Sequence, residues 1–533
     1  MSNTAGTSVE TNDDGLVVEV TGGVIRGIHD GPLRSWRGIP YAAPPTGERR
    51  FRAPGPVIPW EGVRHADDYG PIAPQTVRRL SPIGLASTPV DEDCLTVNVQ
   101  APAPADELLP VMVFIHGGGY SAGSSRDFSG QGESFVLTGR VLYVSFNYRL
   151  GPLGYLDFTR YSTKERPFES NLGLRDQVAL LEWVQQNIAA FGGDPTNVTV
   201  FGESAGGNAV SALLGIPRAQ GLFDRAIAQS APPSSVYPAR LAAEWAGEFV
   251  EIVRQRRLED DNAGNPDDLD DPATLLLSTS ATELVAACSV IQRDSPDTYP
   301  GTFCLAPTIE GDFMPEHPMV AIRDGHFSPV PLIIGTNSRE GTVFRGPLDI
   351  LPTTAPRIGA MFARSTAAGK RLMHAAYPGL PKRHDARDFG GDYGFWYPST
   401  VLADVYSRHA PVHAYRFDFA TRLLRLVGLD ATHGVEMFAL YDRFDLPLVR
   451  AMTTLGGRVA YAAAGQRMRL AWLSFATDGT VPASWPPYDE KRRSTLIIDE
   501  TDRVEQDPRR ERRLAWEEFL HLWKILERWS QRA

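Results

Sequence analysis

The sequence predicts an α/β protein with a large, mostly parallel central sheet and helices on both faces of it. Short, continuously apolar runs rich in β-branched residues alternate along the chain with segments of helical period. Strands that are apolar along their whole length are typical of a sheet covered on both sides, because both of their faces are buried. The clearest expected strands are residues 111–115, 141–146, 198–201, 331–334, 414–419 and 495–498.

One long helix is predicted between the second and third of these strands. Residues 174–191 carry apolar side chains at helical spacing, at Val178, Leu181, Val184 and Ile188. The Gly-Gly-Asp-Pro sequence that follows is typical of a helix end and a turn. A helix in this position packs along one face of the sheet.

The domain organisation is expected to be simple. Residues 1–14 are polar and acidic with no apolar run, which predicts a disordered N-terminal tail. Residues 15–533 are expected to form a single domain, because no internal repeat divides them and large α/β proteins often insert segments into one sheet. Segments around 240–300 and 346–410 are predicted to be helical cap insertions.

Composition argues against several classes of partner. The formal charge is -11 and no basic cluster interrupts the acidity, so a nucleic-acid partner is not expected. No apolar run approaches the roughly 18 residues of a membrane helix, and the N-terminus lacks the features of a secretory signal. Cys94, Cys288 and Cys304 are too few for a disulfide framework; Cys288 and Cys304 could pair, but free thiols are favoured. We therefore expect a cytoplasmic protein, whose oligomeric state the sequence leaves open.

The pattern Gly-x-Ser-x-Gly occurs twice, at 119–123 and 202–206. It is typical of the sharp strand-to-helix turn that presents a nucleophilic serine, although alone it is a weak signal in a glycine-rich chain. Ser204 follows an expected strand and opens a helical segment of small residues, whereas Ser121 is followed by a loop. Ser204 is therefore the predicted nucleophile, and a serine in a purely structural turn is the alternative.

A second motif, His116-Gly117-Gly118-Gly119, directly follows an expected strand. Glycines allow backbone N–H groups to approach a negatively charged oxygen, which acyl transfer requires. A flexible turn or a phosphate loop is the alternative, but the motif lacks the residues of a P-loop and the spacing of a dinucleotide fingerprint. An oxyanion hole is favoured, with His116 supporting the loop rather than transferring protons.

Five further stretches are highly specific in combination. They are Arg-Gly-Ile-Pro-Tyr-Ala at 37–42, Glu-Asp-Cys-Leu-Thr-Val-Asn at 92–98, Asn-Tyr-Arg-Leu-Gly at 147–151, Asn-Leu-Gly-Leu-Arg-Asp-Gln at 171–177 and Phe-Gly-Gly-Asp-Pro at 191–195. Together with the serine motif they resemble the type-B carboxylesterases, the family that includes the cholinesterases and bacterial para-nitrobenzyl-esterase-like enzymes. The resemblance is strong over residues 15–235 and patchier beyond. It implies an α/β-hydrolase fold and a serine esterase.

The resemblance also implies the rest of a catalytic triad. The family's acid lies in a stretch like 335–344, which places it at Glu340, and its histidine lies in a stretch like 431–436, which places it at His433. The order Ser204, Glu340, His433 is the one that this fold requires. A surface ion pair with Arg339 is the alternative for Glu340. The weaker candidates are Asp312 and Asp430 for the acid, and His409 and His413 for the base.

Other roles follow from the same resemblance. Glu203 matches a family carboxylate that orders water near the histidine, and an ion pair between Arg50 and Glu92 is implied. Residues 71–90 contain no aromatic residue, although cholinesterases carry one there that binds choline by a cation–π contact, so choline esters are disfavoured. The implied oxyanion donors are the N–H groups of Gly118, Gly119 and Ala205.

The expected reaction is the two-step hydrolysis of a small-molecule carboxylic ester, with a short- to medium-chain acyl group carried on Ser204. Neither a metal nor an organic cofactor is expected. The alternatives are a lipase-like esterase acting on longer acyl chains and a non-catalytic cholinesterase-like binding protein. Because His433 must be neutral to act as the base, activity is expected to fall below about pH 6.

Overall fold

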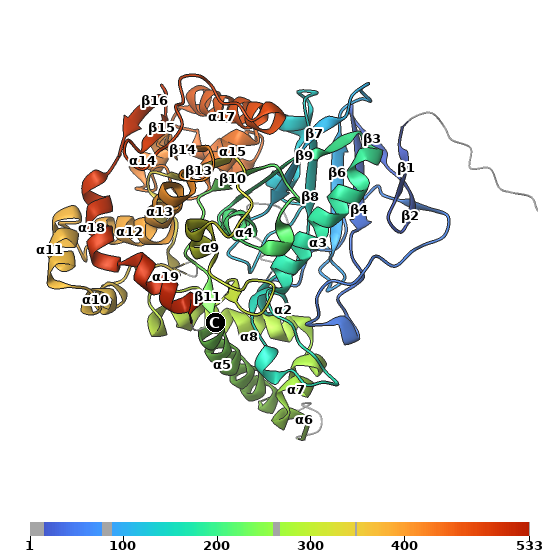
Figure 1. The fold of residues 1–533 in the computed structure, drawn as a ribbon, viewed down its shortest axis with the longest axis horizontal. Helices are drawn as coiled ribbons and strands as arrows, with labels where there is room; N and C mark the ends of the chain where they lie inside the picture. Colours follow the sequence, from blue (N-terminus) through green and yellow to red (C-terminus); the bar gives the residue numbers. More distant parts are fainter. Residues whose placement is uncertain (1–14, 77–87, 260–266, 347–348, 532–533) are drawn as a thin grey trace, which may run out of the picture.

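The computed structural model describes residues 15–76, 88–259, 267–346 and 349–531, so the tail expected at residues 1–14 lies outside the described part. Figure 1 shows one large twisted sheet crossing the molecule, with helices on both sides. The predicted α/β class is confirmed. Neighbouring strands are parallel from β8 through to β15 and antiparallel at both ends of the sheet.

The main sheet has eleven strands. In the order in which they lie side by side, they are β16 (Arg503–Gln506), β15 (Ser494–Ile498), β14 (Val412–Phe417), β13 (Leu332–Asn337), β10 (Arg225–Gln229), β9 (Gly193–Glu203), β7 (Leu109–Ile115), β8 (Leu142–Phe146), β6 (Thr96–Ala101), β4 (Leu33–Pro40) and β3 (Ile28–Asp30). Six of these, β7, β8, β9, β13, β14 and β15, are the predicted strands. Two small sheets lie outside the main sheet. The first comprises β1 (Val17–Val20), β2 (Gly23–Arg26) and β5 (Val63–His65), and the second comprises β11 (Tyr237–Pro238) and β12 (Thr308–Ile309).

Each face of the sheet has its own hydrophobic core, as strand β7 shows. Val111, Val113 and Ile115 belong to one core, and Met112 and Phe114 belong to the other. Successive side chains of a strand point to opposite faces, so a strand buried on both faces must be apolar throughout. The continuously apolar runs in the sequence have this cause.

Helices from distant parts of the chain supply the two cores. The first core takes in α2 (Gly151–Tyr155), α3 (Leu172–Asn187), α4 (Ala205–Leu213), α9 (Pro318–Asp324), α13 (Tyr397–Tyr406) and α19 (Leu522–Ser530). The second takes in α1 (Glu133–Val136), α14 (Arg422–Leu426), α15 (Val435–Leu440), α16 (Pro447–Met452) and α17 (Arg458–Asp478). Helix α3 is the predicted helix, continued to Phe191 by a short 3-10 turn.

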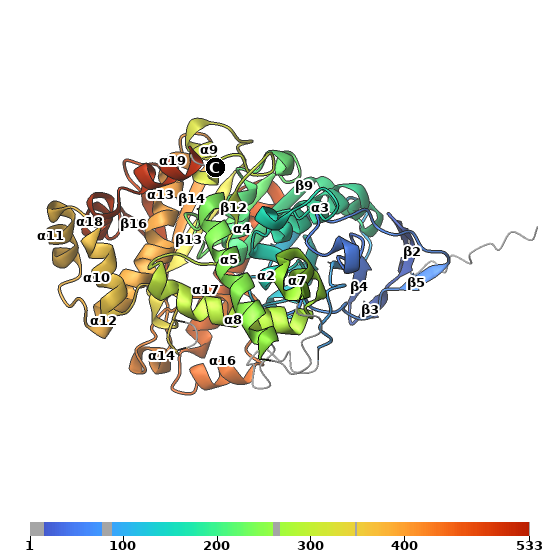
Figure 2. The ribbon, with the colours of Figure 1, turned by 90° about the horizontal axis from the view of Figure 1, so that it is seen from below.

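Two further groups of helices lie beyond the sheet in Figures 1 and 2. One group, at the bottom of Figure 1, comprises α5 (Ala239–Leu258), α6 (Asp267–Asp270), α7 (Pro272–Ser278) and α8 (Ala281–Thr298). The other lies at the left edge of both views and comprises α10 (Ala355–Ala363), α11 (Ala367–Ala376), α12 (Arg383–Gly391) and α18 (Arg510–Leu520). Within the described ranges, no helix is by itself long and apolar enough to cross a membrane; α7 and α8 reach that length and composition only as a pair bent by 117°.

Candidate active site

Ser204 occupies the sharp turn between β9 and α4, with φ 60° and ψ −122°. Residues other than glycine rarely adopt a positive φ, so the surrounding structure must hold the serine in this conformation. Its N–H donates to the carbonyl of Gln229 on the neighbouring strand at 3.0 Å. A Cβ on Gly202 or Gly206 would lie 2.6 or 2.0 Å from backbone atoms, which explains why the turn needs glycine on both sides. The turn leaves Ser204 half-buried at the carboxyl edge of the sheet.

Glu340 and His433 meet at the same edge. Glu340 begins the 3-10 turn η7 (Glu340–Thr342) after β13, and its Oε2 accepts a hydrogen bond from Nδ1 of His433 at 2.6 Å. Its other oxygen accepts from the Ser230 hydroxyl at 2.8 Å and from the Asn337 N–H at 2.6 Å. These bonds hold the carboxylate in place and, through Nδ1, orient the imidazole ring.

The second nitrogen of the imidazole faces Glu203, the residue before Ser204. Nε2 of His433 lies 3.2 Å from Oε1 of Glu203, an ion pair when the ring is protonated. Among the described residues Nε2 has no hydrogen-bond partner. The structure therefore brings Glu340 and His433 into direct contact and Ser204 next to Glu203, but it contains no hydrogen bond between Ser204 and His433.

Three glutamates around His433, two of them buried and Glu203 largely buried, control its charge. Burial lowers the pKa of His433, but the negative charges of Glu203 and Glu340 outweigh this effect and raise the pKa to about 9. Burial raises the pKa of Glu203 to about 7. It also raises the pKa of Glu436 to about 8, with a further rise from the charges of Glu203 and Glu340. The ordinary histidine pKa assumed from the sequence does not hold for His433.

The glycine loop after β7 lies against the serine turn. A Cβ on Gly117 would lie 2.6 Å from the carbonyl oxygen of Glu203 and 3.2 Å from Cβ of Ser204, and a Cβ on Gly118 would lie 2.1 Å from the carbonyl oxygen of Ala122. Only glycine therefore fits at these positions without displacing the chain. In the described part of the chain, the N–H groups of Gly118, Gly119 and Ala205 have no acceptor. They are free to donate to an oxygen bound beside the serine.

His116 lies at the base of this loop and is buried. Its ring stacks on Tyr148 with centroids 4.3 Å apart, and the Tyr148 hydroxyl donates to the His116 carbonyl at 2.6 Å. Nδ1 donates to the carbonyl oxygen of Gly117 at 2.9 Å. Burial lowers the pKa of His116 to about 4, so the ring is neutral at neutral pH. These contacts are those of a side chain that shapes the loop.

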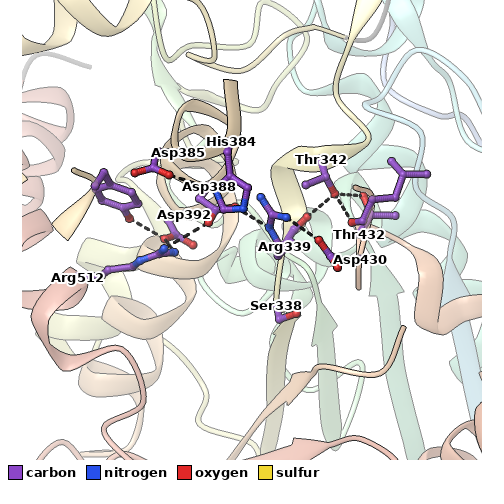
Figure 3. Close-up of polar contacts among 12 residues, drawn as sticks. Ser338, Arg339, Thr342, His384, Asp385, Asp388, Asp392, Asp430, Thr432 and Arg512 are labelled. Atoms are coloured by element: carbon purple, nitrogen blue, oxygen red, sulfur yellow. Dashed lines mark hydrogen bonds and ion pairs between the residues drawn. The ribbon is translucent and has the colours of Figure 1, made fainter. Parts of the chain in front are cut away.

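Arg339, the residue before Glu340, pairs with two aspartates and not with Glu340. Figure 3 shows it between Asp388 on α12 and Asp430, at 2.9 and 2.5 Å. Arg512 on α18 lies 3.3 Å from the other oxygen of Asp388. The chain around Glu340 is thereby fastened to the helices at the left edge of Figure 1.

The loops that carry Glu340 and His433 are also fastened to each other. The hydroxyl of Thr342 donates to the carbonyl of Leu429 at 2.6 Å and lies 2.8 Å from the hydroxyl of Thr432, as Figure 3 shows in part. Thr432 directly precedes His433. Short hydrogen bonds therefore hold together two segments that are distant in sequence.

The weaker candidates from the sequence lie elsewhere. Asp430 is held by Arg339, and Asp312 is exposed. His409 is exposed, and the ring of His413 packs on Trp485 with centroids 5.5 Å apart. None of them contacts Ser204, Glu340 or His433 in any described interaction.

Sequence reasoning assigned no role to three residues of the site. Ser230, which binds the carboxylate, follows β10, and its place at the carboxyl end of a buried strand would have been the available signal. Phe344 and Phe395 lie against the imidazole, with ring centroids 5.2 and 4.5 Å from that of His433. Phe395 comes from the π-helix η9 (Asp392–Trp396), and no sequence pattern marks it.

Two further expectations concern residues away from the triad. The implied ion pair between Arg50 and Glu92 is confirmed, with Nε of the arginine 2.8 Å from the carboxylate. Cys94, Cys288 and Cys304 are all buried as free thiols. Within the residues that the structure describes, no three His, Cys, Asp or Glu side chains are grouped to hold a metal ion.

Known proteins resemble this chain over nearly its whole length. The family model described as Carboxylesterase family matches residues 14–354. Para-nitrobenzyl esterase of Bacillus subtilis (strain 168) is 34% identical over 501 residues, which are 93% of this chain and 97% of that protein. Acetylcholinesterase of Bungarus fasciatus is 31% identical over 513 residues, which are 89% of this chain and 81% of that protein. A solved structure of a thermophilic PNB esterase has a TM-score of 0.82 at 33% identity, covering 94% of this chain and 99% of that one.

Proposed function

Since the chain belongs to the carboxylesterase family, has the α/β-hydrolase fold and is a serine carboxylesterase that hydrolyses carboxylic esters, we propose a catalytic triad for it. Ser204 is the nucleophile, His433 is the general base, and Glu340 is the acid that orients the base. The observation that carries this proposal is the 2.6 Å bond between Glu340 and Nδ1 of His433, beside the strained turn at Ser204. A buried carboxylate on Nδ1 selects the tautomer whose Nε2 accepts a proton.

The proposed reaction has two steps on one serine. Nε2 of His433 turns from Glu203 to the Ser204 hydroxyl and takes its proton as the oxygen attacks the ester carbonyl. The alcohol leaves with that proton, and water then attacks the acyl-enzyme by the same route. Glu203, 3.2 Å from Nε2, stabilises the imidazolium that forms in each step.

The N–H groups of Gly118, Gly119 and Ala205 are the proposed oxyanion donors. Their lack of acceptors among the described residues supports this role, because a preformed donor costs no rearrangement when charge develops. His116, buried and neutral, supports the loop that carries two of these donors.

The proposed substrates are small-molecule esters with short- to medium-chain acyl groups. Para-nitrobenzyl esterase, 34% identical to this chain, is named for an ester of a small aromatic alcohol. A lipase-like esterase acting on longer acyl chains is the second candidate. A p-nitrophenyl ester panel from acetate to palmitate separates the two, because a sharp rise in rate above the micellar threshold of the ester would favour the lipase-like enzyme.

The same panel on Ser204→Ala tests the nucleophile. Loss of the serine removes the covalent route, and we expect kcat to fall by at least about a thousandfold on every ester, since losing a triad serine costs about a millionfold in a well-studied protease. Short-ester hydrolysis at the wild-type rate in this variant would refute the assignment.

We also propose that residues 15–533 form one domain, in which the segments at 240–300 and 346–410 cap the site. Phe395, in the second segment, lies against the imidazole of His433, which supports this role. Arg50, which pairs with Glu92, contacts the first segment by donating to the carbonyl of Thr279 at 2.8 Å. The three free thiols agree with a reducing compartment, and we propose the cytoplasm as the location.

A further inference from the structure

The most exposed apolar side chains of the described chain lie on two segments that contact each other, one of which ends just before His433. Val459 is 85% exposed and Leu426 is 75% exposed, the highest values among the large hydrophobic residues of the described ranges. Val427, Leu448 and Leu455 are also exposed. An isolated exposed leucine is ordinary on a protein surface, whereas a group of them on neighbouring elements indicates a contact surface.

These side chains lie on two segments in contact, α14 (Arg422–Leu426) with its following turn and residues 446–459, which together are called the face below. The Thr421 hydroxyl, at the start of α14, donates to the carbonyl of Met452 on α16 at 2.7 Å. Figure 2 shows α14 and α16 side by side at its lower edge. Leu424, Val449 and Met452 are buried in the core beneath. The helices are therefore anchored on one side and present apolar side chains to solvent on the other.

The same face is basic, in a chain whose formal charge is -11. Its four arginines are Arg422, Arg425, Arg450 and Arg458. Residues 421–429 and 446–459 contain no Asp or Glu. Among the described residues, none of the four guanidinium groups forms an ion pair or hydrogen bond; Arg458 only stacks over the ring of Phe444, at 5.5 Å.

The acidic residues that directly flank the two segments, Asp430 after the first and Asp445 before the second, have arginine partners. Asp430 is bound by Arg339, and Asp445 lies 3.4 Å from Arg443. The four arginines of the face therefore have no acidic partner among the described residues. Unpaired cations around exposed leucine and valine are complementary to a partner that offers anionic groups and an apolar layer together.

We propose that this apolar–basic face docks on the surface of an anionic lipid membrane. Leucine and valine side chains enter the boundary between headgroups and acyl chains, while the arginines contact lipid phosphates and carboxylates. An acidic protein surface would satisfy the arginines but not five exposed apolar side chains, so lipid is the favoured partner. Each arginine held at an anionic membrane strengthens binding by about fivefold.

Docking through this face would bring the active site close to esters dissolved in the lipid. This consequence of the proposal rests on the proposed esterase function. His433 comes seven positions after Leu426, and an extended chain of seven residue steps spans at most about 25 Å. The backbone at His433 is therefore within about that distance of the backbone at Leu426. Esters concentrated at the membrane would reach the serine without first dispersing in water.

The test measures binding of the full-length Ser204→Ala chain to lipid vesicles by co-sedimentation, so that it does not depend on catalysis. The vesicles are phosphatidylcholine alone, or phosphatidylcholine with about a third phosphatidylserine. We expect binding to the anionic vesicles and much weaker binding to the neutral ones. We also expect binding to weaken at high salt, because exposed charges are screened.

Two double variants and a matched control identify the face. Arg422→Gln with Arg425→Gln should weaken anionic binding by about twenty-fivefold, from two losses of about fivefold each. Leu426→Ser with Val459→Ser should weaken it by at least about tenfold. The control, Arg371→Gln with Leu372→Ser, alters an exposed Arg–Leu pair on α11 and should bind as the parent chain does.

Three results would overturn the proposal. The first is equal binding to neutral and anionic vesicles, and the second is an equal loss in the α11 control. The third is a dimer, seen by analytical ultracentrifugation, that Leu426→Ser with Val459→Ser dissociates, because a second copy would then cover the face. In the chain with Ser204 intact, unchanged p-nitrophenyl acetate hydrolysis by the variants shows that they are folded. Failure of vesicle binding would leave the proposed esterase site untouched.

Discussion

Replacing Glu203 with glutamine should move the pH dependence of ester hydrolysis to lower pH. The carboxylate lies 3.2 Å from Nε2 of His433, and it is the first of the charges that raise the pKa of this imidazole to about 9. Glutamine keeps the shape and a polar oxygen but removes the negative charge. With less negative charge nearby, the protonated imidazole is less stable and the neutral base forms at lower pH.

The size of the shift follows from the distance and from the titration of Glu203 itself. An opposite charge within about 4 to 6 Å changes a pKa by about one to three units, and each unit corresponds to about 1.4 kcal/mol. The pKa of Glu203 is itself raised to about 7 by burial, so its carboxyl is partly neutral near that pH. We therefore expect the acid limb of the profile to move down by about one to two pH units.

The measurement is kcat/KM for p-nitrophenyl acetate as a function of pH, which reports the pKa of the base in the free enzyme. For the wild type we expect activity still to be rising above pH 7, in contrast to the limit near pH 6 expected of an ordinary histidine. The control is Glu490→Gln, which removes a surface carboxylate paired with Arg408 and should leave the midpoint unchanged. Coincident midpoints for Glu203→Gln and wild type would show that Glu203 does not set the pKa of His433.

Two other substitutions test the neighbouring contacts. Arg339→Met leaves Asp388 and Asp430 without their shared partner and should lower the free energy of unfolding by about 3 kcal/mol in urea melts. The control, Arg408→Met, breaks an exposed ion pair and should lower the free energy of unfolding by less than about 1 kcal/mol. An equal decrease in the two variants would contradict the reasoning. Glu340→Gln should lower kcat by at least about a thousandfold while the melting curve changes little, and a variant that loses stability but keeps its turnover would show that Glu340 is not the acid.

Most of the fold could be predicted where burial leaves a simple pattern. Strands β7, β8 and β13 lie between two cores, and their sequences are apolar in consecutive positions. β10 is also buried, but its sequence Arg-Ala-Ile-Ala-Gln has no β-branched run. β16 is an exposed edge strand with only Val504 apolar. Both were missed because their pairing comes from neighbouring strands rather than from local preference.

In the active site too, some residues could be predicted from local sequence and others could not. The Ser204 turn and the glycine loop could be predicted because close backbone contacts, such as the 2.0 Å that a Cβ on Gly206 would make, permit only glycine. Such constraints act between residues close in sequence or at a strand end, and they leave a motif. Glu340 and His433 could be named from family resemblance, but no local steric rule marks either of them.

By itself, the sequence determined the α/β class, the buried parallel strands and the two glycine-flanked motifs, because each depends on local geometry or on the burial of a whole strand. Only the tertiary structure decided the proton affinity of His433. Its pKa depends on burial and on the distances to Glu203, Glu340 and Glu436, which separate elements bring together. Electrostatic energy depends on distance through space and not on separation along the chain, so no motif could carry it.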